Sequence, residues 1–149
     1  MLKGFKPGFK KNLDRKLAEE TEKKKADAAE LELAARKEMA RQAPDFAEAG
    51  ALLGRAIDAD SSRADLYATR AWAHLCAGMP REAERDAGSA LRLDPHMKRA
   101  RQHLGVALMQ QGRFAESTVA LDLAISEDSP TPPKVTPRAK DESGAALEQ

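Results

Sequence analysis

The chain has 149 residues, of which 42% are hydrophobic and 33% are charged, but only 4% are aromatic. Strands are enriched in aromatic and β-branched residues, so this composition favours an all-α fold. The formal net charge of +1 gives no overall attraction to nucleic acid or anionic membrane. The single cysteine, Cys76, excludes an intrachain disulfide, and the sequence shows neither a membrane-spanning run nor a secretory signal, so we expect a soluble cytoplasmic protein.

Residues 1–29 predict a basic amino-terminal arm that continues into a charged helix. Two glycines and a proline predict that residues 1–12 are mobile, whereas residues 13–43 lack both residue types and have a strong helix composition. Apolar residues recur among the lysines of this segment at every third or fourth position: Leu2, Phe5, Phe9, Leu13 and Leu17. This pattern is compatible with contact to an anionic membrane, a nucleic acid or a partner protein, and equally with a solvated lead-in.

A pattern with a period of 34 residues occupies the centre of the chain. Similar strings begin at Glu48, Glu82 and Glu116 and carry small or apolar residues at matching positions. The matching columns are Ala49, Ala83 and Ser117; Leu53, Ala87 and Leu121; Ala56, Ala90 and Ala124; and Ile57, Leu91 and Ile125. Their spacing places them on one stripe of a helix, and the small residues predict the close approach of a second helix.

Turn signals divide this region into helices. Helices are predicted over residues 65–77, 80–93, 97–111 and 114–127. Gly78 and Gly112 suit the left-handed backbone that follows a helix, and Pro80 suits the first helical turn. The sequence therefore predicts antiparallel helix pairs, followed by a proline-rich, disordered tail over residues 131–149.

A helix–turn–helix unit of 34 residues resembles the tetratricopeptide repeat. The resemblance is carried in residues 64–97 by Tyr67, Ala71, Gly78, Ala83, Ala90 and Pro95, and in residues 98–130 by Leu104, Gly105, Gly112, Phe114 and Ala124. Residues 30–63 match only in part, because Lys37 occupies the small position of the first helix. The resemblance implies an all-α superhelix of stacked antiparallel pairs, with two good repeats and one partial repeat behind the long charged helix.

The resemblance also implies a function, which is binding a peptide or a partner helix on the concave face without catalysis or a cofactor. The candidate residues on this face are Thr69, Trp72, Arg99, His103, Val106 and Met109. Trp72 is the expected anchor, because large aromatic residues are frequent binding hot spots, although it could instead pack against Val106 or a neighbouring helix. The three histidines share no metal-ligand spacing with Cys76, so we expect neither a metal site nor an enzyme.

The strings from residue 66 to 95 and from 98 to 117 are most similar to co-chaperone repeats. In that branch, Lys, Asn, Asn, Lys and Arg clamp the C-terminal carboxylates of heat-shock chaperones. The corresponding positions here are Ala34, Glu38, Thr69, Arg99 and His103. Only Arg99 keeps the clamp chemistry, and Glu38 is predicted to repel a carboxylate, so the clamp is mostly not retained.

Two functional hypotheses follow. In the first, the chain is an adaptor whose concave groove binds a protein. In the second, it is an assembly factor whose basic amino terminus contacts an anionic membrane or a nucleic acid.

The apolar residues of the last helix exceed what one partner helix can bury, which predicts that a second copy or a protein partner covers them.

Overall fold

The computed structural model describes residues 7–126, and every regular element in this range is an α-helix. The helices are α1 (Pro7–Met39), α2 (Phe46–Ala59), α3 (Ala64–Cys76), α4 (Pro80–Leu93), α5 (Lys98–Gln110) and α6 (Phe114–Ser126). The all-α fold class is thereby confirmed. The predicted tail over residues 131–149 lies outside the described residues.

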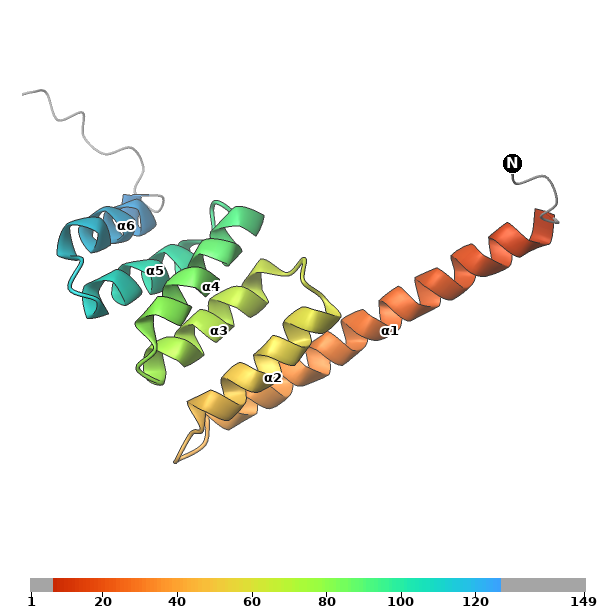
Figure 1. The fold of residues 1–149 in the computed structure, drawn as a ribbon, viewed down its shortest axis with the longest axis horizontal. Helices are drawn as coiled ribbons and strands as arrows, with labels where there is room; N and C mark the ends of the chain where they lie inside the picture. Colours follow the sequence, from red (N-terminus) through yellow and green to blue (C-terminus); the bar gives the residue numbers. More distant parts are fainter. Residues whose placement is uncertain (1–6, 127–149) are drawn as a thin grey trace, which may run out of the picture.

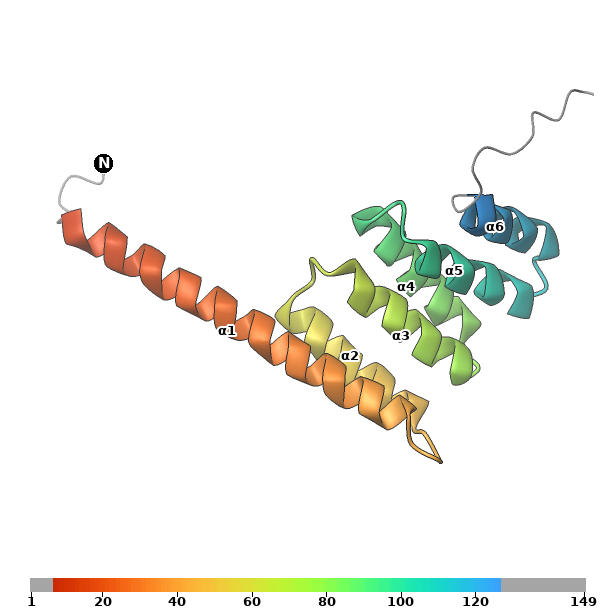
Figure 2. The same ribbon diagram turned by 180° about the vertical axis from the view of Figure 1, so that it is seen from behind.

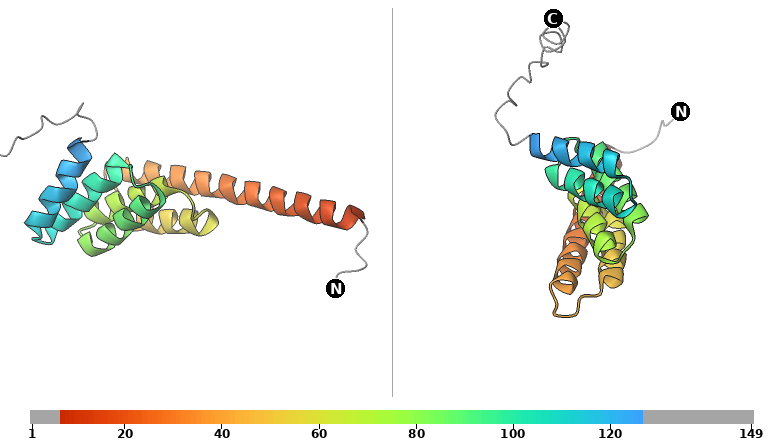
Figure 3. Two further views of the ribbon diagram at one scale, coloured as in Figure 1. Left: turned by 90° about the horizontal axis from the view of Figure 1, so that it is seen from above. Right: turned by 90° about the vertical axis from the view of Figure 1, so that its left-hand side faces the viewer.

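The six helices form three antiparallel pairs that stack side by side (Figure 1, Figure 2). Each helix packs on its neighbours in sequence, and α3 also packs on α5. The long α1 is different, because only its C-terminal part lies against α2. The remainder extends away from the stack as a single helix (Figure 3).

The last four helices begin and end within one residue of their predicted bounds. Gly78 and Gly112 follow α3 and α5 with φ angles of 74° and 76°, in the left-handed region that glycine tolerates. Pro80 opens α4, where its missing N–H removes no helical hydrogen bond. Local turn chemistry therefore determines these boundaries.

The amino-terminal helix differs from the prediction at its start. Residues 7–12 were expected to be mobile, but α1 begins at Pro7. The first N–H groups of a helix have no intrahelical partner, so proline costs nothing there. Gly8 lies in the same first turn, and the roughly 1 kcal/mol that glycine costs in a helix interior is evidently tolerated.

The register of α1 also differs from the 34-residue period. Lys37 is exposed, and the small buried residues of α1 are instead Ala28 and Ala35. The reason is the connection to α2, which spans residues 40–45, whereas the turns after α3 and α5 contain three residues each. The longer connection shifts α1 along its own axis, so the period cannot be extended into this helix.

The core consists mostly of alanine, and the largest fully buried side chains are Leu53 and Leu66. The predicted small columns are buried in all three pairs, as at Ala56, Ala90 and Ala124. Helices that meet at alanine approach closely and leave little room between them. Larger side chains therefore project from the seams and form the walls of surface grooves.

A buried polar cluster interrupts this apolar core between α3 and α4. Asp86 is 4% exposed and accepts two hydrogen bonds from Arg70, at 2.8 and 2.6 Å. Nδ1 of His74 lies 2.9 Å from the same carboxylate. Gly50 and Gly54 of α2 lie next to this cluster, and a Cβ atom at either glycine would be within 3.6 Å of His74 or Arg70. Both distances are ordinary van der Waals contacts, so α2 packs directly over the polar side chains.

Candidate functional site

A groove of about 360 Å³ lies between α3 and α5. It is lined by Thr69, Trp72, Arg99, Gln102 and His103. Helices α3 and α5 are the first helices of consecutive pairs and lie side by side (Figure 1). Because both present their side chains to the same groove, residues about 30 positions apart in sequence become neighbours.

The structure brings together four of the six candidate residues, which are Thr69, Trp72, Arg99 and His103. Val106 is outside this group and packs on Leu75, Ala83 and Ala107 in the core. Met109 is exposed but does not line the groove. The role of all six residues in binding stays a prediction.

Gln102 lines the groove although the sequence analysis did not single it out. Its position could have identified it from the sequence, because it lies three residues after Arg99 on the same helix, and side chains at that spacing share a face. Its amide can donate two hydrogen bonds and accept others, which suits recognition of a peptide backbone.

Trp72 is 47% exposed, and its indole ring stacks on the imidazole of His103. The ring centroids are 5.6 Å apart and the planes are inclined by 28°. Trp72 therefore packs on the neighbouring helix α5 through His103, which was one of the two expectations. About half of its surface remains accessible, and its role as a binding anchor stays a prediction.

His103 is fixed by the backbone of the neighbouring helix. Its Nδ1 lies 2.9 Å from the carbonyl oxygen of Ala68, so Nδ1 carries a proton and donates it. Burial lowers the pKa of His103, the hydrogen bond to Ala68 offsets part of this effect, and the positive charge of Arg99 lowers the pKa again. The imidazole is therefore neutral at neutral pH and presents Nε2 as an acceptor.

Arg99 provides the positive charge among the five residues that line the groove. Its side chain is exposed at the start of α5. Thr69 contributes less polarity than its type suggests, because its hydroxyl is buried and donates to the carbonyl of Asp65 at 2.8 Å. The groove thus combines an aromatic surface, one cation and one amide, and it suits a peptide with an apolar side chain and a carboxylate.

The other two clamp positions do not line this groove. Glu38 lies at the end of α1, where it accepts hydrogen bonds from Arg41 at 2.9 Å and from the backbone N–H of Asp45 at 3.3 Å. Ala34 lies beside Arg55 of α2. The predicted repulsion of a carboxylate by Glu38 relied on the 34-residue register, which does not hold in α1, and the carboxylate is neutralised by Arg41.

Residues 77–133 match the family model described as Tetratricopeptide repeat. The repeat in this part of the chain is a tetratricopeptide repeat. Solved structures with the same fold include the second tetratricopeptide domain of Spaghetti (RPAP3), bound to the HSP90 peptide SRMEEVD. It is 25% identical, with a TM-score of 0.67 over 71% of this chain and 95% of that one. The TPR2AB domain of yeast Sti1, at 22% identity and a TM-score of 0.66, covers 93% of this chain and 50% of that one, and shows the fold alone.

Among curated proteins, the rice (Oryza sativa subsp. japonica) Protein SGT1 homolog is 37% identical over 101 residues. The match covers 68% of this chain but only 28% of the rice protein.

Within residues 7–126, no helix is long and apolar enough to cross a membrane. In the same range, no three His, Cys, Asp or Glu side chains are grouped so that they could hold a metal ion.

Proposed function

We propose that this tetratricopeptide protein is a non-enzymatic adaptor that binds a peptide segment in the groove between α3 and α5. The observation that carries the proposal is the half-exposed Trp72, which is stacked on His103 beside the cation of Arg99. The indole would contact an apolar side chain of the ligand, and Arg99 would bind a carboxylate.

The similarity to the Spaghetti domain supports a co-chaperone-like ligand, since that domain is bound to a peptide ending in Glu-Glu-Val-Asp. Such a peptide has a C-terminal carboxylate, three acidic side chains and an apolar valine. The groove offers one cation and a neutral imidazole, so the contribution of apolar contacts to affinity should exceed that of charge. We infer a ligand that requires one carboxylate and one apolar side chain.

The experiment uses Trp72 as its own probe, because it is the sole tryptophan of the chain. The peptide SRMEEVD is titrated while indole emission is recorded, once with a free C-terminus and once as the C-terminal amide. Arg99→Gln is expected to weaken binding of the free acid about tenfold, or about 1.4 kcal/mol, and to leave the amide almost unchanged.

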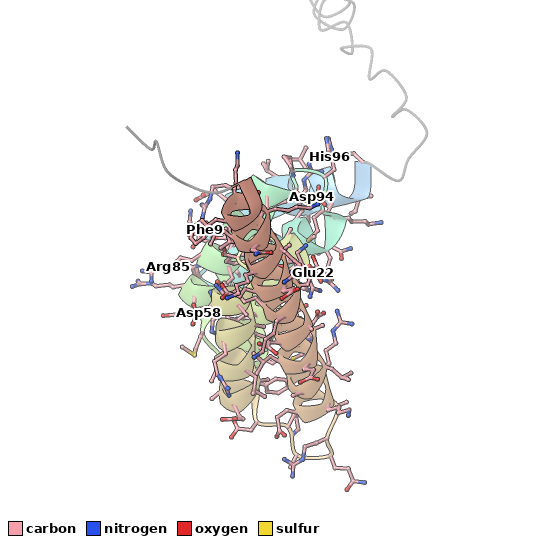
Figure 4. The ribbon with its side chains drawn as sticks, turned by 90° about the vertical axis from the view of Figure 1, so that its right-hand side faces the viewer. Phe9, Glu22, Asp58, Arg85, Asp94 and His96 are labelled. Atoms are coloured by element: carbon pink, nitrogen blue, oxygen red, sulfur yellow. The ribbon has the colours of Figure 1, made fainter. Side chains whose placement is uncertain are left out.

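Arg85→Gln is the matched control, because Arg85 is exposed, projects outward from α4 (Figure 4) and does not line the groove. This variant should bind the free acid like the wild type. Calorimetry on Trp72→Ala completes the set and should show a loss of affinity of roughly 2 kcal/mol or more. Equal binding by the wild type and a folded Trp72→Ala variant would contradict the groove assignment.

A further inference from the structure

A second groove lies on the opposite side of α5. Its volume is about 370 Å³, and we call it the α4–α6 groove. It is lined by Leu91 of α4, by Arg101, Leu104 and Leu108 of α5, and by Glu116, Val119, Ala120 and Leu123 of α6. The α5 residues of this groove and those of the Trp72 groove lie on opposite helix faces, because each residue advances a helix by about 100°. The two grooves are therefore separate surfaces.

The preceding repeat fills the same positions with polar side chains. Arg70, His74 and Asp86 form the buried cluster there, and the residues 34 positions later are Leu104, Leu108 and Ala120. The first set is covered by α2 beside Gly50 and Gly54. The second set is apolar and forms the floor of the groove, where Leu108 and Ala120 are buried, while Val119 and Leu123 at its side are 61% and 51% exposed. Exposed apolar side chains around a groove are typical of an interaction surface.

The part of α1 that extends beyond α2, residues 7–24, presents a complementary surface, and we call it the α1 extension. Residues 8–27 are all exposed, whereas Ala28 is the first buried residue. Leu13 and Leu17 are each about half exposed and lie four residues apart on one stripe of the helix. The α1 extension contains six basic and four acidic residues and therefore has a net charge of +2; these are Lys10, Lys11, Arg15, Lys16, Lys23 and Lys24 against Asp14, Glu19, Glu20 and Glu22.

The net charges of α6 and of the α1 extension are opposite. Helix α6 contains Glu116 and Asp122 but no basic residue, although Glu116 is already paired with Arg113 next to the start of the helix. Arg101 is the cation of the groove, and its guanidinium donates to the carbonyls of Leu123 and Pro95. A docked extension can place Asp14 near Arg101 and its lysines near the acidic residues of α6. Such pairing selects the orientation of a bound helix more than it adds affinity.

We propose that the α1 extension of one copy docks in the α4–α6 groove of a second copy. The same chain cannot supply the contact, because its extension points away from α6 at the opposite end of the molecule (Figure 1, Figure 3). The carboxyl-terminal segment is a poor alternative, since residues 127–149 contain only two large aliphatic residues, Val135 and Leu147. Two such contacts in a reciprocal pair would bury both exposed surfaces.

Sedimentation velocity on the full chain, over a range of protein concentrations, tests this contact. The wild type is expected to associate, and more weakly at high salt because the flanking charges are screened. Leu13→Asp combined with Leu17→Asp should raise the dissociation constant by more than about tenfold, and so should Leu123→Glu. Ala18→Asp and Thr118→Glu are the matched controls on other faces of α1 and α6, and both should associate like the wild type.

Mixing the two defective variants identifies the contact. The Leu13/Leu17 variant retains an intact groove and the Leu123 variant retains an intact extension, so together they should form a complex through one remaining contact. If each variant is defective and the mixture is also monomeric, the extension and the groove do not bind each other and the proposal is wrong. If the Leu123→Glu variant still associates by itself, extensions pair with each other and the proposal is wrong as well. Charge reversal at Lys10 and Lys11, which are exposed on the helix surface, provides a second variant that leaves the fold intact.

Three further results would overturn the proposal. The first is a wild-type protein that stays monomeric at every concentration. The second is a loss of association on deletion of residues 127–149, which would assign the contact to that segment. The third is a monomer that binds anionic vesicles through Lys10 and Lys11 and does not self-associate, because the extension would then be a membrane-targeting element.

Discussion

At the scale of single residues, the groove between α3 and α5 is defined by how His103 is held. The sequence alone does not determine whether a histidine on a helix face is charged or neutral. The carbonyl of Ala68 fixes the proton on Nδ1, and burial together with Arg99 keeps the pKa of the ring below its ordinary value. The groove therefore gains a second positive charge only under acidic conditions.

Binding of a carboxylate peptide should consequently strengthen as the pH falls below the ordinary range of histidine. The pKa of His103 is lowered, so the ring is neutral above this range and becomes charged below it, while peptide carboxylates stay ionised until about pH 4. Emission of Trp72 during peptide titrations at a series of pH values measures the effect. His103→Gln should remove the pH dependence, and a wild-type affinity that is flat over this range would contradict the role given to His103.

A second residue-scale prediction concerns Asp86 in the polar cluster. Burial alone would raise the pKa of Asp86, but the adjacent ring nitrogen of His74 and the hydrogen-bonded guanidinium of Arg70 outweigh it and hold the pKa below its ordinary value. Stability from this carboxylate is therefore present above the ordinary aspartate pKa and is lost as the pH falls through the lowered value. Asp86→Asn should cost on the order of 2–3 kcal/mol, because it leaves the positive charge of Arg70 without its partner.

Chemical denaturation at neutral and acidic pH checks this cost. Asp27→Asn is the control, since Asp27 is exposed on α1, and it should change the free energy of unfolding by less than about 0.5 kcal/mol. The difference between the wild type and Asp86→Asn should shrink in acid. A difference that is constant with pH would show that the carboxylate is not the stabilising group.

At the scale of elements, the helix pairs are held together by close approach. The close approach between α5 and α6 is illustrated by Gly105, since a Cβ atom built there would lie 2.6 Å from Cγ and Cδ2 of Leu121. That distance is far inside van der Waals contact, and the obstructing Cγ atom cannot move without the whole side chain. Gly88 in α4 differs, since a Cβ atom there would meet nothing within 4 Å.

These two glycines give a matched pair of substitutions. Gly105→Ala should destabilise the protein by about 1–3 kcal/mol through overpacking against Leu121, despite the better helix propensity of alanine. Gly88→Ala should stabilise it by roughly 0.5–1 kcal/mol, because only the propensity changes. Thermal unfolding followed by circular dichroism compares them. Two variants that shift the melting temperature in the same direction would contradict the assigned seam between α5 and α6.

At the scale of the whole molecule, the two proposed contacts use different parts of the chain. Peptide binding uses the groove between α3 and α5, whereas self-association uses the α1 extension and the α4–α6 groove. All of residues 8–27 are exposed, so removal of the extension should leave the stack of helices folded.

Deletion of residues 1–24 should therefore leave peptide affinity unchanged and abolish self-association. Calorimetry with the peptide and sedimentation of the same sample measure both properties at once. A truncated protein that loses peptide binding while its helicity is intact would assign the groove function to the amino terminus. A truncated protein that still self-associates would contradict the proposed contact between the α1 extension and the α4–α6 groove, but not the proposed peptide binding.

The sequence by itself determined the repeat architecture, because its signals are local. The positions of Gly78, Pro80 and Gly112 and the spacing of alanine columns depend only on neighbouring residues. The same periodicity placed Thr69, Trp72, Arg99 and His103 on facing sides of two helices. It failed in α1, where a longer connection changes the register and nothing in the local composition records the shift.

The tertiary structure alone decided which side chains interact across helices. The stack of Trp72 on His103, the proton position on that imidazole, and the cluster around Asp86 all join residues from different elements. The sequence could not predict these contacts, since Arg70 and His74 have the pattern of ordinary polar helix residues, and only the fold brings Asp86 close to them. The open apolar groove beside Leu123 is likewise a property of the stack, because exposure depends on which neighbouring helix is present to cover a residue.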